Sequence, residues 1–260
     1  MKTTSYNIVL IGAGNVATQM GLALKEAKHS IVQIYSKSKS SSEKLAKLLK
    51  CEQTNSPEKI SKTADIYIIA VNDDAVADVI KRLQLSNQIV VHTSGSVEMD
   101  ILKSAAKNYG VFYPLQTFSK NKKADFKTIP ICLEANNTST LKVIQSLGKS
   151  ISNNVRTINS EQRKVVHLSA VFACNFTNHF YAIASDILAS KKLSLDILKP
   201  LIEETANKIK NNSPAKMQTG PAIRGDKKTM NAHLKLLENK EYKKLYKLMS
   251  ESIMKLKQSD

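Results

Sequence analysis

The feature that most constrains the fold is a glycine-containing turn that directly follows the first apolar run. Residues 6–11 are rich in apolar and β-branched side chains, which predicts a buried strand. The next six residues, 12–17 (GAGNVA), have the pattern G-x-G-x-x-A, and a helical pattern covers residues 16–27. A strand that turns into a helix through two such glycines is typical of the first unit of a parallel α/β sheet.

The rest of the first half alternates short β-rich runs with helical segments. Further strands are expected at Ile31–Tyr35, Ala64–Val71, Gln88–His92, Gly110–Tyr113, Ile129–Leu133 and Val155–Ile158. Helices are expected at Ser42–Lys50, Ala75–Leu83, Met99–Asn108 and near Thr140–Leu147. This alternation predicts a doubly wound, mostly parallel sheet.

The pattern changes near residue 160, after which no convincing strand follows. Helices are expected at Glu161–Ala189 as one long segment, then at Ser194–Ile209, Lys227–Leu237 and Glu241–Lys257, with a structured loop over 211–226. We therefore predict an α/β domain at residues 1–158 and an all-α domain at residues 159–260.

The charge of the chain is strongly positive but spread out. Lysine and arginine total 39 against 22 acidic residues, a formal net charge of +17. Only four of the 39 are arginines (Arg82, Arg156, Arg163 and Arg224), and arginine supplies most bidentate contacts to bases and phosphates. We expect no nucleic-acid partner but a lysine-rich surface that attracts anionic ligands.

Cysteine content and hydropathy favour a cytoplasmic protein. The three cysteines are widely spaced and odd in number, which fits reduced thiols and no zinc or other metal site. No apolar run approaches the roughly 20 residues that a membrane span needs. The N-terminus shows no secretory leader pattern, so we expect neither export nor a membrane partner.

The glycine pattern predicts a dinucleotide site. Gly12 would permit the tight turn, and Gly14 would let a pyrophosphate approach the backbone. The helix that begins at Asn15 and Val16 would offer N–H donors and a favourable dipole. An unrelated glycine turn is the alternative, but the strand before it and the helix after it favour the cofactor.

The end of the second predicted strand favours NADP over NAD. A carboxylate that would hold the ribose of NAD is expected there, but the sequence has Ser36, Lys37, Ser38 and Lys39. Two hydroxyls and two ammonium groups suit a 2′-phosphate. Alternatively, both lysines belong only to the lysine-rich surface.

Three further strand ends are expected to line the same crevice, since ligands of such sheets lie beyond the carboxyl ends of the strands. These ends are Val71 with Asn72 and Asp73, then His92 with Thr93 and Ser94, and then residues 113–117. Val71, Asn72, His92 and Thr93 are predicted to contact the cofactor, and Ser94 to serve catalysis. Asp73 and Ser94 could equally be ordinary helix and turn caps.

Together these motifs resemble a known family. The segments GAGNVA, AVNDDAV, VHTSGS, FYPLQTFS, CNFTNH and QTGPAIRGD resemble the oxidoreductases that join a Rossmann-like domain to domain of unknown function 2520. That family is similar to the 6-phosphogluconate-dehydrogenase-like superfamily, which includes pyrroline-5-carboxylate reductase and ketopantoate reductase. The resemblance implies a Rossmann fold, NADP, an all-α C-terminal domain and a dimer, but no particular reaction.

The long predicted helix carries polar residues in an apolar stretch. At 100° per residue, His167, Asn175 and Asn178 share one side of it. They are candidate catalytic groups, or else hydrogen-bonded residues of the core or of a dimer interface. Residues 165–189 contain no lysine, unlike the hydroxyacid dehydrogenases of the superfamily, which carry a catalytic lysine on this helix.

The loop at 218–226 supplies a last candidate. Arg224 offers a planar fork that suits a carboxylate or phosphate, although it could instead pair with Asp226 and fix the loop. If the catalytic assignment is right, His167 and Ser94 border one solvent-connected pocket, in a cleft between the two domains that Arg224 also approaches.

These inferences favour an NADP-dependent oxidoreductase that reduces a C=O or C=N group of a small anionic metabolite, with His167 as the acid. The alternative is a non-catalytic NADP-binding sensor or assembly protein. The long apolar segment at 165–189 offers more hydrophobic surface than one layer of short helices can cover, which predicts a homodimer.

Overall fold

The computed structural model describes residues 4–256 except residues 84 and 121. It divides the chain into two compact units, Met1–Phe172 and Ala173–Asp260. Among the described residues, every helix is too short or too polar to cross a lipid bilayer.

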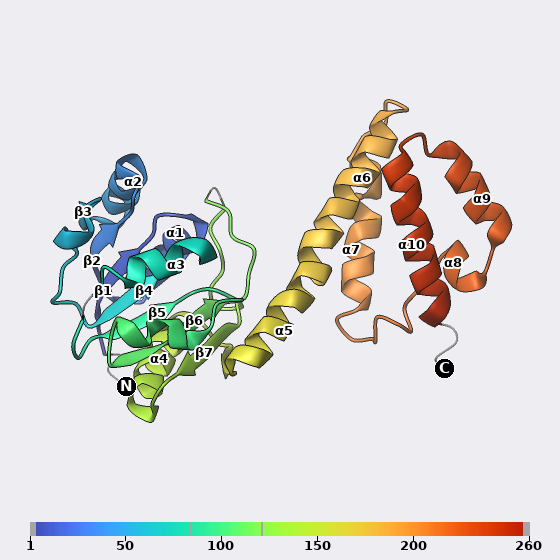
Figure 1. The fold of residues 1–260 in the computed structure, drawn as a ribbon. Helices are drawn as coiled ribbons and strands as arrows, with labels where there is room; N and C mark the ends of the chain where they lie inside the picture. Colours follow the sequence, from blue (N-terminus) through green and yellow to red (C-terminus); the bar gives the residue numbers. More distant parts are fainter. Residues whose placement is uncertain (1–3, 84, 121, 257–260) are drawn as a thin grey trace. The chain divides into compact units, whose positions relative to one another are not determined.

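The first unit is built on a sheet whose described part has eight strands in the order β3-β2-β1-β4-β5-β6-β7-β8 (Figure 1). All neighbours are parallel except β6 and β7. This order confirms the predicted doubly wound Rossmann sheet. In such a sheet, β2 and β3 are added on one side of β1 and the later strands, from β4 on, are added on its other side. The strands are β1 (Asn7–Ile11), β2 (Ser30–Tyr35), β3 (Glu52–Thr54), β4 (Ile66–Ile69), β5 (Ile89–His92), β6 (Asn108–Pro114), β7 (Ile131–Ala135) and β8 (Val155–Thr157).

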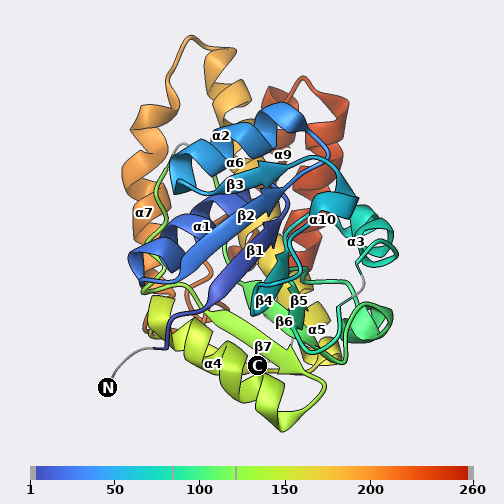
Figure 2. The same ribbon diagram turned by 90° about the vertical axis from the view of Figure 1, so that its left-hand side faces the viewer.

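Helices cover both faces of this sheet, as Figures 1 and 2 show. Ile8 and Leu10 of β1 belong to one apolar cluster and Val9 and Ile11 to the other, and all four side chains are fully buried. Burial on both faces explains why the strand has continuous apolar character. One face packs on α1 (Asn15–Glu26), α2 (Lys39–Leu49) and α4 (Thr138–Ile151), the other on α3 (Asp73–Ile80) and the 3₁₀ helix η2 (Met99–Ser104), with the short 3₁₀ turn η1 (Pro57–Lys59) nearby.

Two segments of the sheet differ from the prediction. The expected helix over 99–108 ends after one 3₁₀ segment, because Asn108 already pairs with Ile89 as the first residue of β6. The short edge strand β3 was not expected; Glu52 to Thr54 pair with β2. A three-residue strand gives too little alternation to be recognised from its sequence.

The expected single helix over 161–189 is wrong in its middle. Helix α5 (Ser160–Ala170) is followed by a π-helical segment, η3 (Val171–Phe176), and then by α6 (Thr177–Ala189). A π segment has wider turns than an α-helix, so the 100° step does not hold through it. The predicted shared side of His167, Asn175 and Asn178 therefore has no geometric basis.

Helix α5 belongs to the first unit although the last strand ends at Thr157, near the predicted boundary. The Arg163 side chain is fully buried and forms an ion pair with Glu134 of β7. It also donates to the Val97 carbonyl, and Ser160 donates to Glu134 with its hydroxyl at 2.8 Å. This network attaches the first turns of α5 to the sheet.

The second unit contains only helices in its described residues, as predicted. Its elements are α6, the 3₁₀ turn η4 (Leu195–Leu198), α7 (Lys199–Lys208), α8 (Pro221–Arg224), α9 (Lys227–Leu236) and α10 (Lys240–Leu256). The expected loop over 211–226 includes the short helix α8, which packs on α9 and α10.

Candidate functional site

The protein fold requires glycine at only one of the two glycine positions of the first turn. Gly12 has φ +121°, and a Cβ there would lie 2.1 Å from the Ala70 carbonyl oxygen, so the fold itself requires glycine. Gly14 is exposed, and a Cβ there would meet nothing within 4 Å. Protein packing therefore leaves open space at Gly14, beside an α1 N-terminus that no side chain caps.

A crevice of about 590 Å³ opens at the carboxyl ends of the central strands. This is where parallel α/β sheets bind their ligands. Its lining comes from four strand ends and from α5: Gly14, Asn15, Val16, Ala70, Val71, Asn72, Asp73, Thr93, Ser94, Gly95, Tyr113, Pro114, Gln116 and His167. Ser94 and His167 thus share one crevice, and His167 reaches it from the first unit rather than from a separate domain.

His167 is held against the end of β6. Its Nδ1 lies 3.0 Å from the Tyr113 hydroxyl, and the two rings pack edge to face with centroids 6.1 Å apart. A Cβ on Gly95 would come within 2.6 Å of the same Nδ1. The imidazole therefore contacts Tyr113 and packs against a position where only glycine leaves enough room.

Ser94 organises the loop that carries Gly95. Its hydroxyl oxygen accepts from the backbone N–H groups of Ser96 at 3.1 Å and of Val97 at 3.0 Å. The Ser96 hydroxyl in turn donates to the Asp73 carboxylate on α3. Ser94 therefore acts as a turn cap in the structure. Asp73 links the loop after β5 to the start of α3. Asn72, and not Asp73, occupies the N-cap position of α3.

His92 lies beneath the crevice instead of lining it. Its side chain is fully buried, and its Nδ1 accepts from the Ser94 N–H at 3.2 Å. Burial, together with the nearby Arg163 guanidinium, lowers its pKa to about 4. A neutral buried ring that accepts from the Ser94 backbone supports the crevice structurally, and the His92 side chain does not line the crevice itself.

The predicted phosphate-binding residues lie at the end of β2. The Ser36 backbone is paired with Thr54, and Lys37 is exposed with its Nζ 3.9 Å from Asp78. Lys37 lines a shallow depression that Arg82 also lines. Arg82 was not expected from the sequence, because it lies 45 positions away along the chain.

The remaining three candidates lie in the second unit. Asn175 lies in η3, Asn178 in α6 and Arg224 in α8, and all three are exposed. Asp226 uses its carboxylate to cap α9, accepting from the Thr229 N–H at 3.0 Å. Asp226 is thus engaged as the cap of α9.

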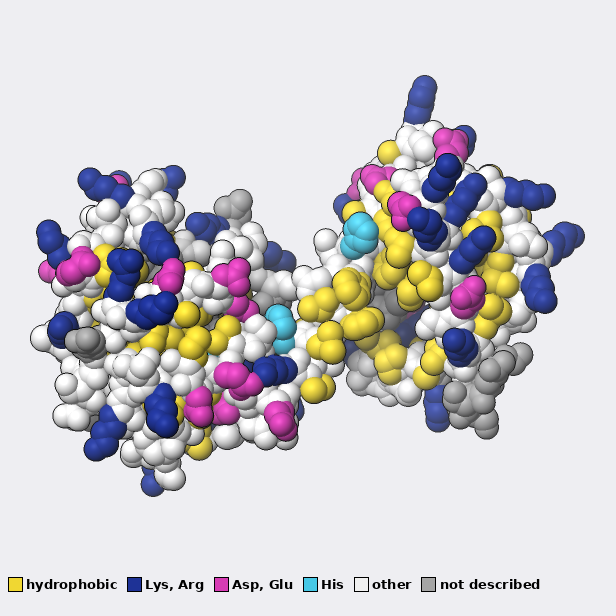
Figure 3. Space-filling view, in the orientation of Figure 1, with side chains coloured by type: hydrophobic (Ala, Val, Ile, Leu, Met, Phe, Trp, Pro, Cys, Tyr) yellow, Lys and Arg dark blue, Asp and Glu magenta, His cyan; other side chains and the backbone are white. Residues whose placement is uncertain are grey.

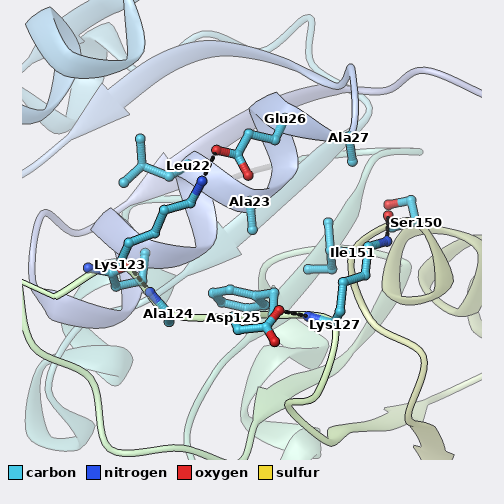
Figure 4. Close-up of a pocket in the computed structure, with 12 residues that line it drawn as sticks. Leu22, Ala23, Glu26, Ala27, Lys123, Ala124, Asp125, Lys127, Ser150 and Ile151 are labelled. Atoms are coloured by element: carbon cyan, nitrogen blue, oxygen red, sulfur yellow. Dashed lines mark hydrogen bonds and ion pairs between the residues drawn. The ribbon is translucent and has the colours of Figure 1, made fainter.

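A second cavity of the first unit, about 380 Å³, has a different character (Figure 4). It lies between α1, residues 123–127 and the end of α4. Lys123 pairs with Glu26 at 2.5 Å, and the Lys127 Nζ donates to the Ser150 carbonyl at 3.1 Å. Because its charged groups already have partners, this cavity offers less polar chemistry than the crevice.

Sequence reasoning placed the strand ends that carry Asp73, Gly95 and Tyr113 at the crevice, but it did not predict the contacts of Tyr113 and Gly95 with His167. Tyr113 stands at a strand end that was expected to line the crevice, which was the available signal. Its hydrogen bond to His167 spans 54 positions of sequence, and no local pattern predicts such a pair.

Comparison with known proteins identifies the two halves of the chain. Residues 1–116 match the model of a Rossmann-like domain, and residues 129–253 match that of domain of unknown function 2520. The chain is 40% identical to a protein of Bacteroides fragilis named "putative NADP oxidoreductase", over 96% of this chain and 98% of that one, with a TM-score of 0.90. No curated protein matches the chain.

Two more distant structures share the fold. A protein of Thermotoga maritima is 22% identical, with 97% and 98% of the two chains covered and a TM-score of 0.70. The 1-pyrroline-5-carboxylate reductase of Streptococcus pyogenes is 15% identical, with 98% and 99% covered and a TM-score of 0.66. The match to the Bacteroides fragilis protein over nearly the whole length, together with both domain models, shows that the chain belongs to the family that joins a Rossmann-like domain to domain of unknown function 2520.

Proposed function

We propose that this chain is an NADP-dependent oxidoreductase that reduces a C=O or C=N group of a small anionic metabolite. The observation that carries the proposal is the crevice at the carboxyl ends of the sheet. It combines the open glycine turn at Gly14 with a tyrosine–histidine pair, Tyr113 and His167. A dinucleotide site beside a proton-donating pair is what a reductase needs.

The residues present fit a dinucleotide. The space at Gly14 and the uncapped N-terminus of α1 suit a pyrophosphate, which Asn15 and Val16 would hold through their backbone N–H groups. Lys37 and Arg82 would receive a 2′-phosphate. When bound, the cofactor supplies the hydride.

The chain itself supplies orientation and a proton. Thr93 and the loop around Ser94 would orient the substrate, and His167 would be the source of the proton that the reduced oxygen or nitrogen takes up. The positive net charge of +17 favours an anionic metabolite. The relative from Streptococcus pyogenes has in its name a substrate with a C=N bond and a carboxylate, which belongs to the same chemical class.

Asn175, Asn178 and Arg224 remain proposed site residues. Their side chains are exposed polar groups on elements of the second unit. Alanine variants of each test the assignment: a substrate-binding residue raises KM, and a residue without a role leaves both kinetic constants unchanged.

A homodimer is part of the proposal. Large apolar side chains of the second unit are exposed, among them Ile197 (67%), Leu201 (62%) and Leu248 (62%). Figure 3 shows apolar side chains on the surface of this unit. A second copy of the chain would cover such a surface.

A screen of 2-oxo acids and cyclic imine carboxylates for NADPH oxidation tests the function. His167→Ala is expected to lower kcat by about 10²–10⁴-fold, the usual contribution of a general acid, and to leave NADPH affinity unchanged. His233→Ala is the matched control, since His233 pairs with the Tyr246 hydroxyl within the second unit. NADPH binding without any turnover would favour the non-catalytic sensor or assembly protein.

A further inference from the structure

The Tyr113 hydroxyl lies 3.0 Å from the His167 Nδ1, and both residues line the crevice. Tyr113 is 9% exposed and stands at the buried end of the pair, whereas His167 is half-buried. Tyr113 is therefore the more buried member of the pair and His167 the more exposed one.

We propose that Tyr113 delivers the proton to the substrate and that His167 replaces it through Nδ1, so that the two residues act as a proton relay. This inference rests on the proposed reductase function and adds a catalytic residue to it. Gly95 acts as a positioning residue, because it leaves room for the imidazole beside Tyr113.

The protons and electrons of the step balance. The hydride adds to the carbon of the C=O or C=N group, and the π-bond pair moves to the oxygen or nitrogen. That atom takes the proton of the Tyr113 hydroxyl, and the phenolic oxygen takes the Nδ1 proton of a protonated His167. The products are the oxidised cofactor, the reduced substrate and neutral His167, which water reprotonates.

The environment of Tyr113 explains why a second residue is needed. Burial raises the pKa of Tyr113 to about 12, with smaller effects from Cys132, Arg163 and Asp73. Tyr113 therefore keeps its proton at neutral pH and makes an unstable anion once that proton leaves. A donor at hydrogen-bond distance that restores the proton in the same step avoids this anion.

The first test needs no substrate. In alkaline buffer, where histidine rings are neutral, a hydroxyl that donates to Nδ1 holds the His167 hydrogen on Nε2. Histidine nitrogen NMR, assigned with His167→Ala, is expected to show this single tautomer in the wild type and a mixture in Tyr113→Phe. A His167 spectrum that Tyr113→Phe leaves unchanged would overturn the relay.

Tyr109→Phe is the matched control. Tyr109 lies in the same strand, is buried to a similar degree (8% exposed), and donates to Asp100 at 3.3 Å. This variant removes a comparable hydroxyl from the same strand but is expected to leave the His167 signals unchanged.

The second test uses whichever 2-oxo acid or cyclic imine the wild type reduces. Tyr113→Phe is expected to lower kcat at least about 100-fold with NADPH affinity unchanged, while Tyr109→Phe stays within about threefold. Imidazole added to the buffer should partly restore His167→Ala but not Tyr113→Phe. Full turnover by Tyr113→Phe overturns the relay alone, whereas no turnover by the wild type overturns the reductase function and the relay with it.

Gly95→Ala tests the positioning. Its Cβ would lie 2.6 Å from Nδ1 and 2.7 Å from Cγ of His167, so the ring must shift and its 3.0 Å contact with the Tyr113 hydroxyl must change. We expect the tautomer mixture of Tyr113→Phe and a comparable loss of kcat, with NADPH binding retained. A Gly95→Ala protein with wild-type kcat and histidine spectrum would show that the seat of His167 is not needed.

Discussion

The two units of the chain bury their apolar side chains to very different extents. In the first unit, both faces of the sheet are covered, and strand residues such as Leu10 and Ile68 are fully buried. In the described part of the second unit, only Ile183, Ala222 and Met230 are buried hydrophobic residues. A cavity of about 290 Å³ with apolar walls also remains between α6, α8 and α10.

This difference shows which parts of the chain can stabilise themselves. Apolar burial contributes roughly 25 cal/mol per Å², and conformational entropy opposes it along the whole chain. The first unit has a two-sided core to offset that entropy. The described part of the second unit leaves many of its large apolar side chains exposed to solvent, so we expect a partner that covers them to contribute to its stability.

The largest effect we predict is therefore the loss of cooperative folding when the second unit is isolated. A fragment of residues 1–172 should unfold in one thermal transition, whereas residues 173–260 at low micromolar concentration should show none. The intact chain should have about twice 28.8 kDa by light scattering, with a Tm that rises with protein concentration. A monomer whose Tm is independent of concentration would contradict the comparison.

A second comparison lies between the two glycines of the first turn, Gly12 and Gly14. Gly12→Ala should cost at least about 3 kcal/mol of stability, because its Cβ would strike the Ala70 carbonyl and its φ of +121° is unfavourable for alanine. Gly14→Ala should change stability by less than about 0.5 kcal/mol, since no atom lies within 4 Å of the new Cβ.

Cofactor affinity should separate the same two variants in the opposite way. The alanine methyl at Gly14 would occupy the space that a pyrophosphate needs, so we expect at least tenfold weaker NADPH binding by a stable protein. Chemical denaturation and calorimetry measure the two quantities. Unchanged NADPH affinity in Gly14→Ala would remove the main support for this cofactor position.

The buried polar floor of the crevice should make the first unit sensitive to acid. The pKa of His92 is lowered from 6.5 to about 4 in the folded chain, so the unfolded chain binds more protons between these values. The contribution of neutral His92 to the free energy of unfolding is complete above pH 6.5. It is lost as the pH falls toward 4, which lowers the free energy of unfolding by about 3 kcal/mol.

Denaturation midpoints between pH 7 and pH 4 measure this loss. His92→Asn should flatten the decline, because the side chain no longer titrates. His179→Asn, at an exposed position of the second unit, should leave it unchanged. An equal decline in all three proteins would mean that His92 does not set the acid sensitivity.

Local patterns in the sequence predict the sheet and its glycine turn, but not how the site is assembled. Gly12, Gly14 and the strand ends follow from short-range patterns, because strand, turn and helix signals lie within a few residues of each other. The position of the His167 side chain depends on Tyr113 and Gly95, which lie at the ends of β6 and β5. It also depends on Arg163, which holds α5 to the sheet.

The π segment shows the same limit within one helix. Residues 171–176 have an apolar pattern that an α-helix would also have, so their sequence gave no sign of wider turns. The angular argument that joined Asn175 and Asn178 to His167 failed there. What remains of the predicted catalytic set on one crevice is Ser94 and His167.

The smallest effect we predict concerns cofactor choice. Lys37 and Arg82 line one exposed depression beside the end of β2, and a charge-assisted contact to a phosphate is worth roughly 1.5–3 kcal/mol. NADPH should therefore bind at least about tenfold more tightly than NADH, which corresponds to about 1.4 kcal/mol.

Lys37→Ala and Arg82→Ala should each reduce that preference by weakening NADPH alone, whereas Lys81→Ala, next to Arg82 but outside the depression, should not. Because these side chains are exposed, added salt should reduce the preference as well. Calorimetric titration of both cofactors decides the point: equal affinities in the wild type would assign Lys37 to the general lysine-rich surface and leave the choice between NADP and NAD to other residues.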